Sequence, residues 1–264
     1  MGLIFFIFIY AQKEALFFQY SSEFFILSLL SLLGSMVVIS ALSFITLYLG
    51  LELLSLPLYA LIALKRNAQH SSEAAMKYFI MGAIASAMLL FGFSLVYGLT
   101  GSIYLANIST HVNILMDADP MFLVALSFIV LAMTFKLGIV PLHMWVPDVY
   151  QGAPLSVVAL LSSIAKLSAL ALLIRFLFNG LAAFRFMGME LLFILGLFSL
   201  IIGHLAALSQ KNIKRLLGYA SVANMGLVFI ALSLPTPAGA ISSVFYFIVY
   251  TFSSLALLGI LMII

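Results

Sequence analysis

The chain has 264 residues, of which 66% are hydrophobic and only 7% are charged, against about 25% charged residues in an ordinary soluble domain. This composition excludes a soluble globular protein and predicts an all-α polytopic membrane protein. The sequence has no cysteine, which excludes disulfides and iron–sulfur clusters held by thiolates. Its net charge of +3 does not indicate a nucleic-acid partner, because basic residues in a membrane chain set its orientation.

The first segment, residues 1–22, begins with a short apolar run that is followed by charged residues. Charges after the apolar run are the reverse of the order in a secretory signal peptide. The run is also too short to cross about 30 Å of hydrocarbon. We therefore expect a partial N-terminal helix and a loop in this segment.

Eight long apolar segments follow, each close to the roughly 20 residues that a membrane-spanning helix needs. We expect helices at residues 24–42, 43–64, 78–99, 120–141, 155–175, 191–208, 216–234 and 240–261. Under this count, seven of the nine basic residues outside the span centres lie on one side of the membrane. The bias supports eight spans and predicts that the loops at 65–77 and 209–215 lie on the inner side.

The fourth span carries a signal for a break in its helix. Pro141 removes a backbone donor and crowds the carbonyl near Leu137, and Gly138 loosens the same turn. We expect the helix to break just after Lys136. Discontinuous helices at membrane depth line a cavity or are buried in protein, and in transporters they mark ion sites. Trp145, which follows the break, is predicted to be an interfacial anchor.

Three charged residues, Glu52, Lys136 and Lys166, lie near the middle of apolar segments. Each costs about 2.5–3.5 kcal/mol at the bilayer centre, so such residues usually mark an ion or proton pathway. A lysine there either finds a carboxylate or loses its proton. Because one glutamate cannot neutralise two lysines, we expect at least one lysine to exchange its proton. The alternatives are lysines that extend to the interface and a glutamate bonded to a nearby serine or tyrosine.

Two histidines are further candidates. His143 follows the predicted break, and it is either the next carrier of a proton from Lys136 or a hydrogen-bonded interfacial residue. His204 lies near the inner end of its span, and its role is open. No nucleotide-binding or metal-binding motif occurs in the sequence, so we expect no cofactor and no metal in this chain.

Three stretches resemble the antiporter-like membrane subunits of respiratory complex I, and the resemblance extends over nearly the whole chain from about residue 23. They are LGLELLSLP at 49–57, FKLGIVPLHMWVPDVYQGAP at 135–154 and SQKNIKRLLGY at 209–219. The resemblance implies an antiporter-like fold of two inverted five-helix repeats, each with a discontinuous transmembrane helix. Residues 23–178 would form the first repeat, with its broken helix at 120–147. Residues 188–264 would form three helices of an incomplete second repeat.

The same resemblance implies roles for individual residues. Glu52 would be the family's conserved carboxylate, Lys136 its paired lysine and Lys166 the lysine of the central axis. His143 would be the histidine on the second half of the broken helix. One departure is Asn224, which stands where relatives often have histidine.

The function that the resemblance implies is proton translocation in the membrane arm of a NADH:quinone oxidoreductase, without redox chemistry in this chain. NADH, FMN, iron–sulfur clusters and quinone would belong to partner subunits. The expected partners are other membrane-arm subunits and the lipid bilayer. For the missing helices two alternatives stay open: the rest of the subunit is not included in this sequence, or a second chain supplies it. The expected location is a bacterial plasma membrane or a mitochondrial inner membrane. Two alternatives stay open: a subunit of a cation/proton antiporter complex, and a truncated chain that serves as a scaffold.

Overall fold

The computed structural model describes residues 21–65, 68–109, 120–180, 188–234 and 236–263. The expected N-terminal helix falls almost wholly outside these residues. The assigned elements are all helical. They are α3 (Ser21–Ser40), α4 (Phe44–Ile62), α5 (Gln69–Thr100), α7 (Pro120–Leu137), α8 (Trp145–Gly152), α9 (Leu155–Leu160), the π-helix η1 (Leu161–Ala165), α10 (Lys166–Arg175), the π-helix η2 (Phe176–Gly180), α12 (Met189–Leu208), α13 (Ile213–Leu232) and α14 (Pro237–Ile263).

Eight helical segments in the described part of the chain are long and apolar enough to cross a membrane, which confirms the predicted number. The prediction for the third span was wrong at its start, because α5 begins at Gln69 and runs for 32 residues. The sequence obscured these extra turns because they carry polar residues. Glu73 and Lys77 form an ion pair of 2.8 Å across one turn of the helix, which is a normal arrangement on an exposed helical surface.

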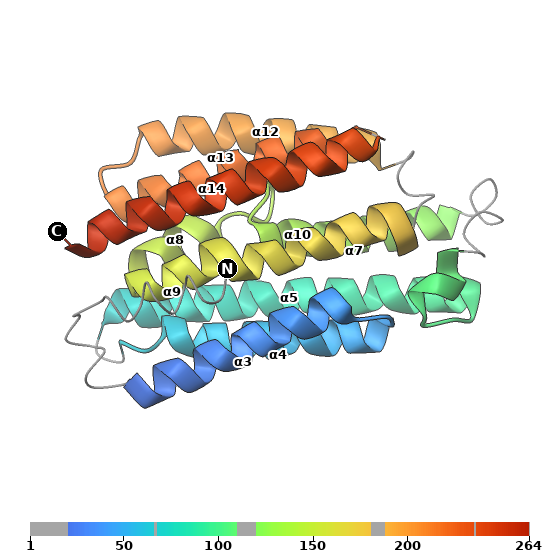
Figure 1. Cartoon of the computed structure of the whole chain (residues 1–264), viewed down its shortest axis with the longest axis horizontal. Coiled ribbons are helices and arrows are strands. Elements are labelled where there is room, and N and C mark those ends of the chain that lie inside the picture. The colour runs from blue at the N-terminus through green and yellow to red at the C-terminus, as the bar shows by residue number, and fades with distance from the viewer. Residues whose placement is uncertain (1–20, 66–67, 110–119, 181–187, 235, 264) are drawn as a thin grey trace.

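The helices run side by side along the length of the molecule (Figure 1). In this view α3, α4 and α5 lie on one side, α12, α13 and α14 on the other, and the broken pair α7–α8 with α9–α10 lies between them. Helix α3 packs along α4, α5 along α7, and α12 along α13. Helices α12 and α13 approach closely at Gly203, where an added Cβ would lie 2.7 Å from the backbone nitrogen of Ala223. Small residues allow such close packing between membrane helices.

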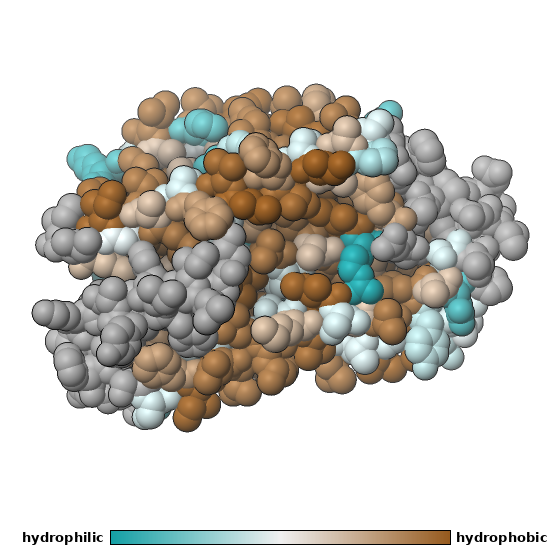
Figure 2. Space-filling model, viewed as in Figure 1, coloured by the Kyte–Doolittle hydropathy of each residue, from teal (hydrophilic) through white to brown (hydrophobic). Residues whose placement is uncertain are grey.

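The outer surface is apolar, whereas the interior contains charged and polar side chains. Ile241 and Phe245 on α14 are 70% and 69% exposed, and apolar residues cover most of the face shown in Figure 2. A contiguous apolar surface of this kind is unsuited to water, but it suits lipid. The buried groups include Lys136, His143 and Lys166, so the interior is where chemistry can take place.

Candidate functional site

The predicted break in the fourth span is confirmed. Helix α7 ends one residue after Lys136, and α8 begins at Trp145. Gly138 has a φ of 75°, a conformation that favours glycine. A Cβ added there would lie 2.6 Å from the Val146 side chain. The peptide bond before Pro141 is cis.

Two side chains bond to backbone groups at the break. The indole of Trp145 donates to the carbonyl of Phe135 at 3.0 Å. The backbone N–H of Val140 donates to the Ser199 hydroxyl, on α12, at 2.9 Å. The prediction that Trp145 is an interfacial anchor was wrong, because its side chain is buried and its ring lies 4.5 Å from that of Tyr78. Trp145 instead holds the two halves of the broken helix together.

Lys136 is bonded to a hydroxyl and not to the predicted carboxylate. Its Nζ donates to the Oγ of Ser55, on α4, at 2.9 Å. The Ser55 hydroxyl donates in turn to the carbonyl of Leu51. The carboxylate of Glu52 accepts a hydrogen bond of 2.5 Å from Ser86, on α5. None of the ion pairs among the described residues joins Glu52 to Lys136, so the predicted pair is not in direct contact.

Lys166 begins α10 directly after the π-helix η1. A π-turn widens the helix and disturbs its regular hydrogen bonds, and such turns are frequent at functional sites. The hydroxyls of Ser162 and Ser163 donate to the carbonyl of Ala159 at 3.1 and 2.6 Å. These two serines therefore supply hydrogen bonds inside the widened turn, a feature that the sequence analysis missed.

The Lys166 side chain is almost fully buried and extends to the break. A Cβ added to Gly138 would lie 3.9 Å from its Nζ. That ammonium donates to the Oγ of Ser221, on α13, at 2.6 Å, and the hydroxyl of Tyr150, on α8, donates to the same Oγ at 3.3 Å. The tertiary fold therefore brings Lys166 to the segment that directly follows Lys136, as the sequence spacing alone could not show.

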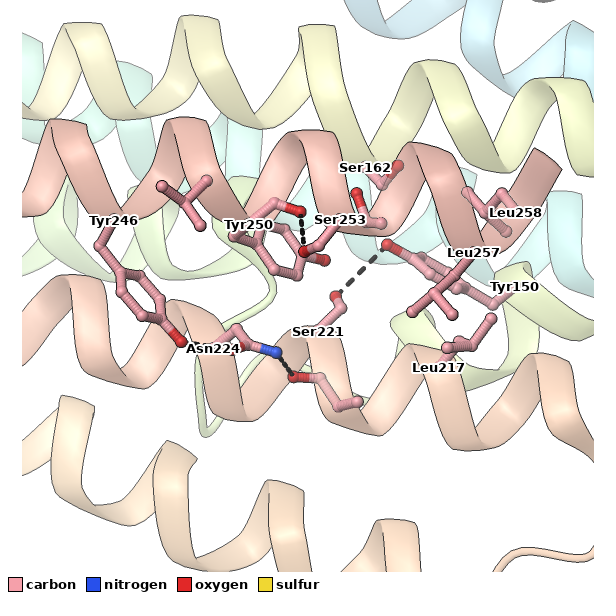
Figure 3. Close-up of a pocket in the computed structure, with 13 residues that line it drawn as sticks. Tyr150, Ser162, Leu217, Ser221, Asn224, Tyr246, Tyr250, Ser253, Leu257 and Leu258 are labelled. Atoms are coloured by element: carbon pink, nitrogen blue, oxygen red, sulfur yellow. Dashed lines mark hydrogen bonds between the residues drawn. The ribbon is translucent and has the colours of Figure 1, made fainter. Parts of the chain in front are cut away.

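A partly polar cavity of about 170 Å³ is lined by Ser221 and its neighbours (Figure 3). Residues of α8, η1, α13 and α14 line it. At one end the hydroxyl of Tyr246 donates to the side-chain carbonyl of Asn224 at 2.5 Å, and the Asn224 amide donates to the carbonyl of Ala220 at 2.7 Å. A polar cavity of this volume has room for water molecules.

The two candidate histidines lie apart from these contacts. His143 is buried after the break, and its Nδ1 lies 3.3 Å from the carbonyl of Pro141. No hydrogen bond among the described residues joins it to Lys136 or Lys166. His204 is exposed on α12, with its Nδ1 2.8 Å from the carbonyl of Leu200.

A charged cluster that the sequence analysis missed holds the second half of the broken helix. Asp148, on α8, forms ion pairs of 2.8 Å with Lys77 and 2.7 Å with Arg215. Partial burial acts to raise the pKa of the Asp148 carboxyl, but hydrogen bonds from both cations outweigh it and lower the pKa. The cluster thus ties α8 to α5 and to α13. Within the described residues, no group of histidines and carboxylates could hold a metal ion.

The sequence profile of the family described as "NADH:quinone oxidoreductase/Mrp antiporter, TM" matches residues 41–264. A NADH-quinone oxidoreductase subunit N from Ruthia magnifica subsp. Calyptogena magnifica is 44% identical over 253 residues. That alignment covers 95% of this chain and 52% of the relative. The chain therefore spans about half the length of the curated relatives that it matches.

Solved structures show the same fold. A chain of respiratory complex I from Thermus thermophilus with bound aureothin aligns with a TM-score of 0.72 and 35% identity, covering 88% of this chain and 50% of that one. A chain of the Mrp complex from Dietzia sp. DQ12-45-1b aligns with a TM-score of 0.79 and 22% identity, covering 88% of this chain and 43% of that one. The predicted antiporter-like membrane fold is confirmed.

Proposed function

The chain belongs to the family of NADH:quinone oxidoreductase/Mrp antiporter membrane proteins, and we propose that it transfers protons as a membrane subunit of a NADH:quinone oxidoreductase. One observation carries the proposal: two buried lysines, Lys136 and Lys166, meet at a broken helix, and each donates to a neutral hydroxyl. A buried cation in a membrane segment is costly and is retained mainly where it has a function.

The hydroxyl partners suit lysines that gain and lose protons. A lysine donates to a serine oxygen whether its nitrogen is charged or neutral, and the serine proton can rotate to suit either state. Neither state therefore leaves a buried polar atom without a partner, which would be costly. A permanent ion pair, in contrast, would hold each lysine in its charged form.

We propose that the distance of Glu52 from Lys136 controls the transfer. A nearby carboxylate favours the charged form of Lys136, and its withdrawal favours release of the proton. One N–H bond of the Lys136 ammonium would then break, and the proton would pass through water or His143 to the neutral amine of Lys166. Both steps exchange a proton alone, so no redox group is needed in this chain.

The choice of complex rests on the degree of similarity. Relatives named NADH-quinone oxidoreductase subunit N are 44% identical, whereas the aligned chain of the Mrp complex is 22% identical. We propose that quinone reduction in partner subunits drives the transfer and that other membrane subunits adjoin this chain. A bacterial plasma membrane is the proposed location. NADH, FMN, iron–sulfur clusters and quinone would all be held by partners.

The test is proton pumping by the assembled complex in inverted membrane vesicles supplied with NADH and quinone. Lys136→Ala and Lys166→Ala are expected to lower the number of protons pumped per NADH at least severalfold, with assembly unchanged. Lys211→Ala, an exposed lysine between α12 and α13, is the control. Normal pumping in both test variants would overturn the proposal. Activity that requires a sodium gradient instead of NADH and quinone would favour the antiporter alternative.

A further inference from the structure

Ser86 makes an unusual hydrogen bond for a serine inside a helix. Such serines commonly donate to a carbonyl three or four residues earlier in the same helix. Ser94, two turns along α5, does so with Phe91 at 2.8 Å. Ser86 instead donates across the helix interface to the carboxylate of Glu52 at 2.5 Å. The hydroxyl of Ser86 is therefore directed at a group of the proposed proton path.

Glu52 has a second place to which its carboxylate can move. It lies three residues before Ser55 on α4, so the two side chains share one side of that helix. Ser55 contacts the Nζ of Lys136 at 2.9 Å. Rotation about the side-chain bonds of Glu52 can therefore carry the carboxylate from Ser86 toward Lys136. In the structure it lies with Ser86.

The carboxylate of Glu52 is not tightly packed where it meets Ser86. A pocket of about 240 Å³ between α4 and α5 is lined by Glu52 and Ser86. The charge of Glu52 acts on Tyr48 and Tyr59 from its own helix, on Tyr78 from α5 and on Lys136 from α7. Lys136 is the one cation in that set, so it is the natural second partner of the carboxylate.

We propose that Ser86 is a positioning residue that holds Glu52 away from Lys136. The inference rests on the proposed function, and it names the group that competes with Lys136 for the carboxylate. A hydrogen bond to a charged acceptor changes an equilibrium by about tenfold or more, here the equilibrium between a Glu52 carboxylate near Ser86 and one near Lys136. Removal of the Ser86 hydroxyl therefore shifts Glu52 toward Lys136, where it would retain the proton.

Ser86→Ala is expected to lower proton pumping by the assembled complex by about threefold to tenfold, because the hydroxyl no longer competes for Glu52. Ser86→Thr keeps the hydroxyl, and the adjoining pocket has room for its methyl group, so pumping is expected to return close to the wild-type rate. Ser94→Ala is the matched control on the same helix, and it is expected to pump normally.

The same substitution in a chain that already carries Glu52→Gln distinguishes a residue that positions Glu52 from one that only supports the fold. In a chain that carries Glu52→Gln, Ser86→Ala is expected to cause no further loss, since there is no carboxylate to hold. An equal loss in both backgrounds, or failure of Ser86→Thr to restore pumping, would overturn the inference. If Ser86→Ala does not assemble, Ser86→Cys serves in its place, because it keeps the volume and weakens the donor.

Lys136→Ala, measured in parallel, distinguishes failure of this inference from failure of the proposed function. Reduced pumping in Lys136→Ala with normal pumping in Ser86→Ala refutes only the role of Ser86. Normal pumping in Lys136→Ala removes Lys136 from the proton path and refutes the role of Ser86 with it. Normal pumping in Lys166→Ala as well refutes the path itself.

Discussion

The two buried lysines have different surroundings, although each donates to a serine. Lys136 ends a helix at a break, and a carboxylate that it does not contact lies on the neighbouring helix. Lys166 follows a π-turn inside a continuous span, and its Ser221 contact borders a cavity lined by hydroxyl groups. The hydrogen-bond partner of Lys166, the Ser221 hydroxyl, is neutral.

The proton affinity of a buried lysine can therefore be set in two ways. The proton affinity of Lys136 would depend on where one charged side chain lies. Lys166 would depend on hydroxyl groups and on water in the adjoining cavity, which can substitute for one another. A single substitution should therefore lower pumping strongly near Lys136 and weakly around Lys166.

The largest effect is expected from Glu52→Gln, which removes the charge but keeps the side-chain shape. Without a carboxylate, Lys136 loses the group that would favour its charged form, so pumping should fall by about tenfold or more. The measurement is protons pumped per NADH in vesicles. Glu190→Gln, an exposed glutamate in the first turn of α12, is the control. Equal pumping by both variants would show that Lys136 does not depend on the charge of Glu52.

Ser199→Ala tests the break that separates the two regions. The substitution leaves the partly buried N–H of Val140 without its partner, which should lower the free energy of unfolding by about 1 kcal/mol. Unfolding in detergent micelles measures the change. Ser209→Ala removes an exposed hydroxyl that donates to Ala206, and it should change stability far less. Equal stability of the two variants would show that Ser199 does not support the break.

Much of the fold follows from the sequence because apolar span length and backbone chemistry are local signals. Pro141 and Gly138 predicted the position of the break, and α7 ends where they require. Glu73 and Lys77 concealed the start of α5, since their i,i+4 pairing depends on a helix that composition alone does not predict.

The candidate site was less predictable because its contacts join helices that lie far apart in the sequence. Ser55 and Ser221 could not be selected as lysine partners from among many serines. The separation of Glu52 from Lys136 depends on Ser86, which carries no local signal. The sequence gives no signal for the ion pairs of Asp148, because its partners lie 71 and 67 positions away.

Asp148→Asn is expected to lower the free energy of unfolding by less than Ser199→Ala. The substitution weakens the ion pairs that hold α8, the helix whose Tyr150 lies beside Ser221 and Lys166. The side chain of Asp148 is 23% exposed, so the loss at neutral pH should be about 0.5–1 kcal/mol. Because the pKa of Asp148 is lowered in the folded protein, its contribution is complete above the ordinary carboxyl pKa of 3.8. This stabilisation is lost as the pH falls through the lower pKa that Asp148 has in the folded protein.

The thermal stability of the wild type and Asp148→Asn, measured from pH 4 to pH 8, checks this sign. The difference should be constant from about pH 6 to pH 8 and should shrink toward the acid end. Glu73→Gln is the control in the same cluster, and its 59% exposure predicts a smaller change. A difference that grows on acidification would contradict the assignment of Asp148 as a stabilising carboxylate.

The smallest effect is expected from Tyr150→Phe, which acts on the Lys166 region alone. The lost hydrogen bond is long, at 3.3 Å, and Ser221 still accepts from Lys166 at 2.6 Å. Water in the neighbouring cavity can replace the phenol hydroxyl, so pumping should change by less than about twofold. Ser221→Ala, which removes the direct partner of Lys166, should have the larger effect. If Tyr150→Phe instead reduces pumping as strongly as Glu52→Gln, both lysines depend on one fixed partner, and the contrast between them fails.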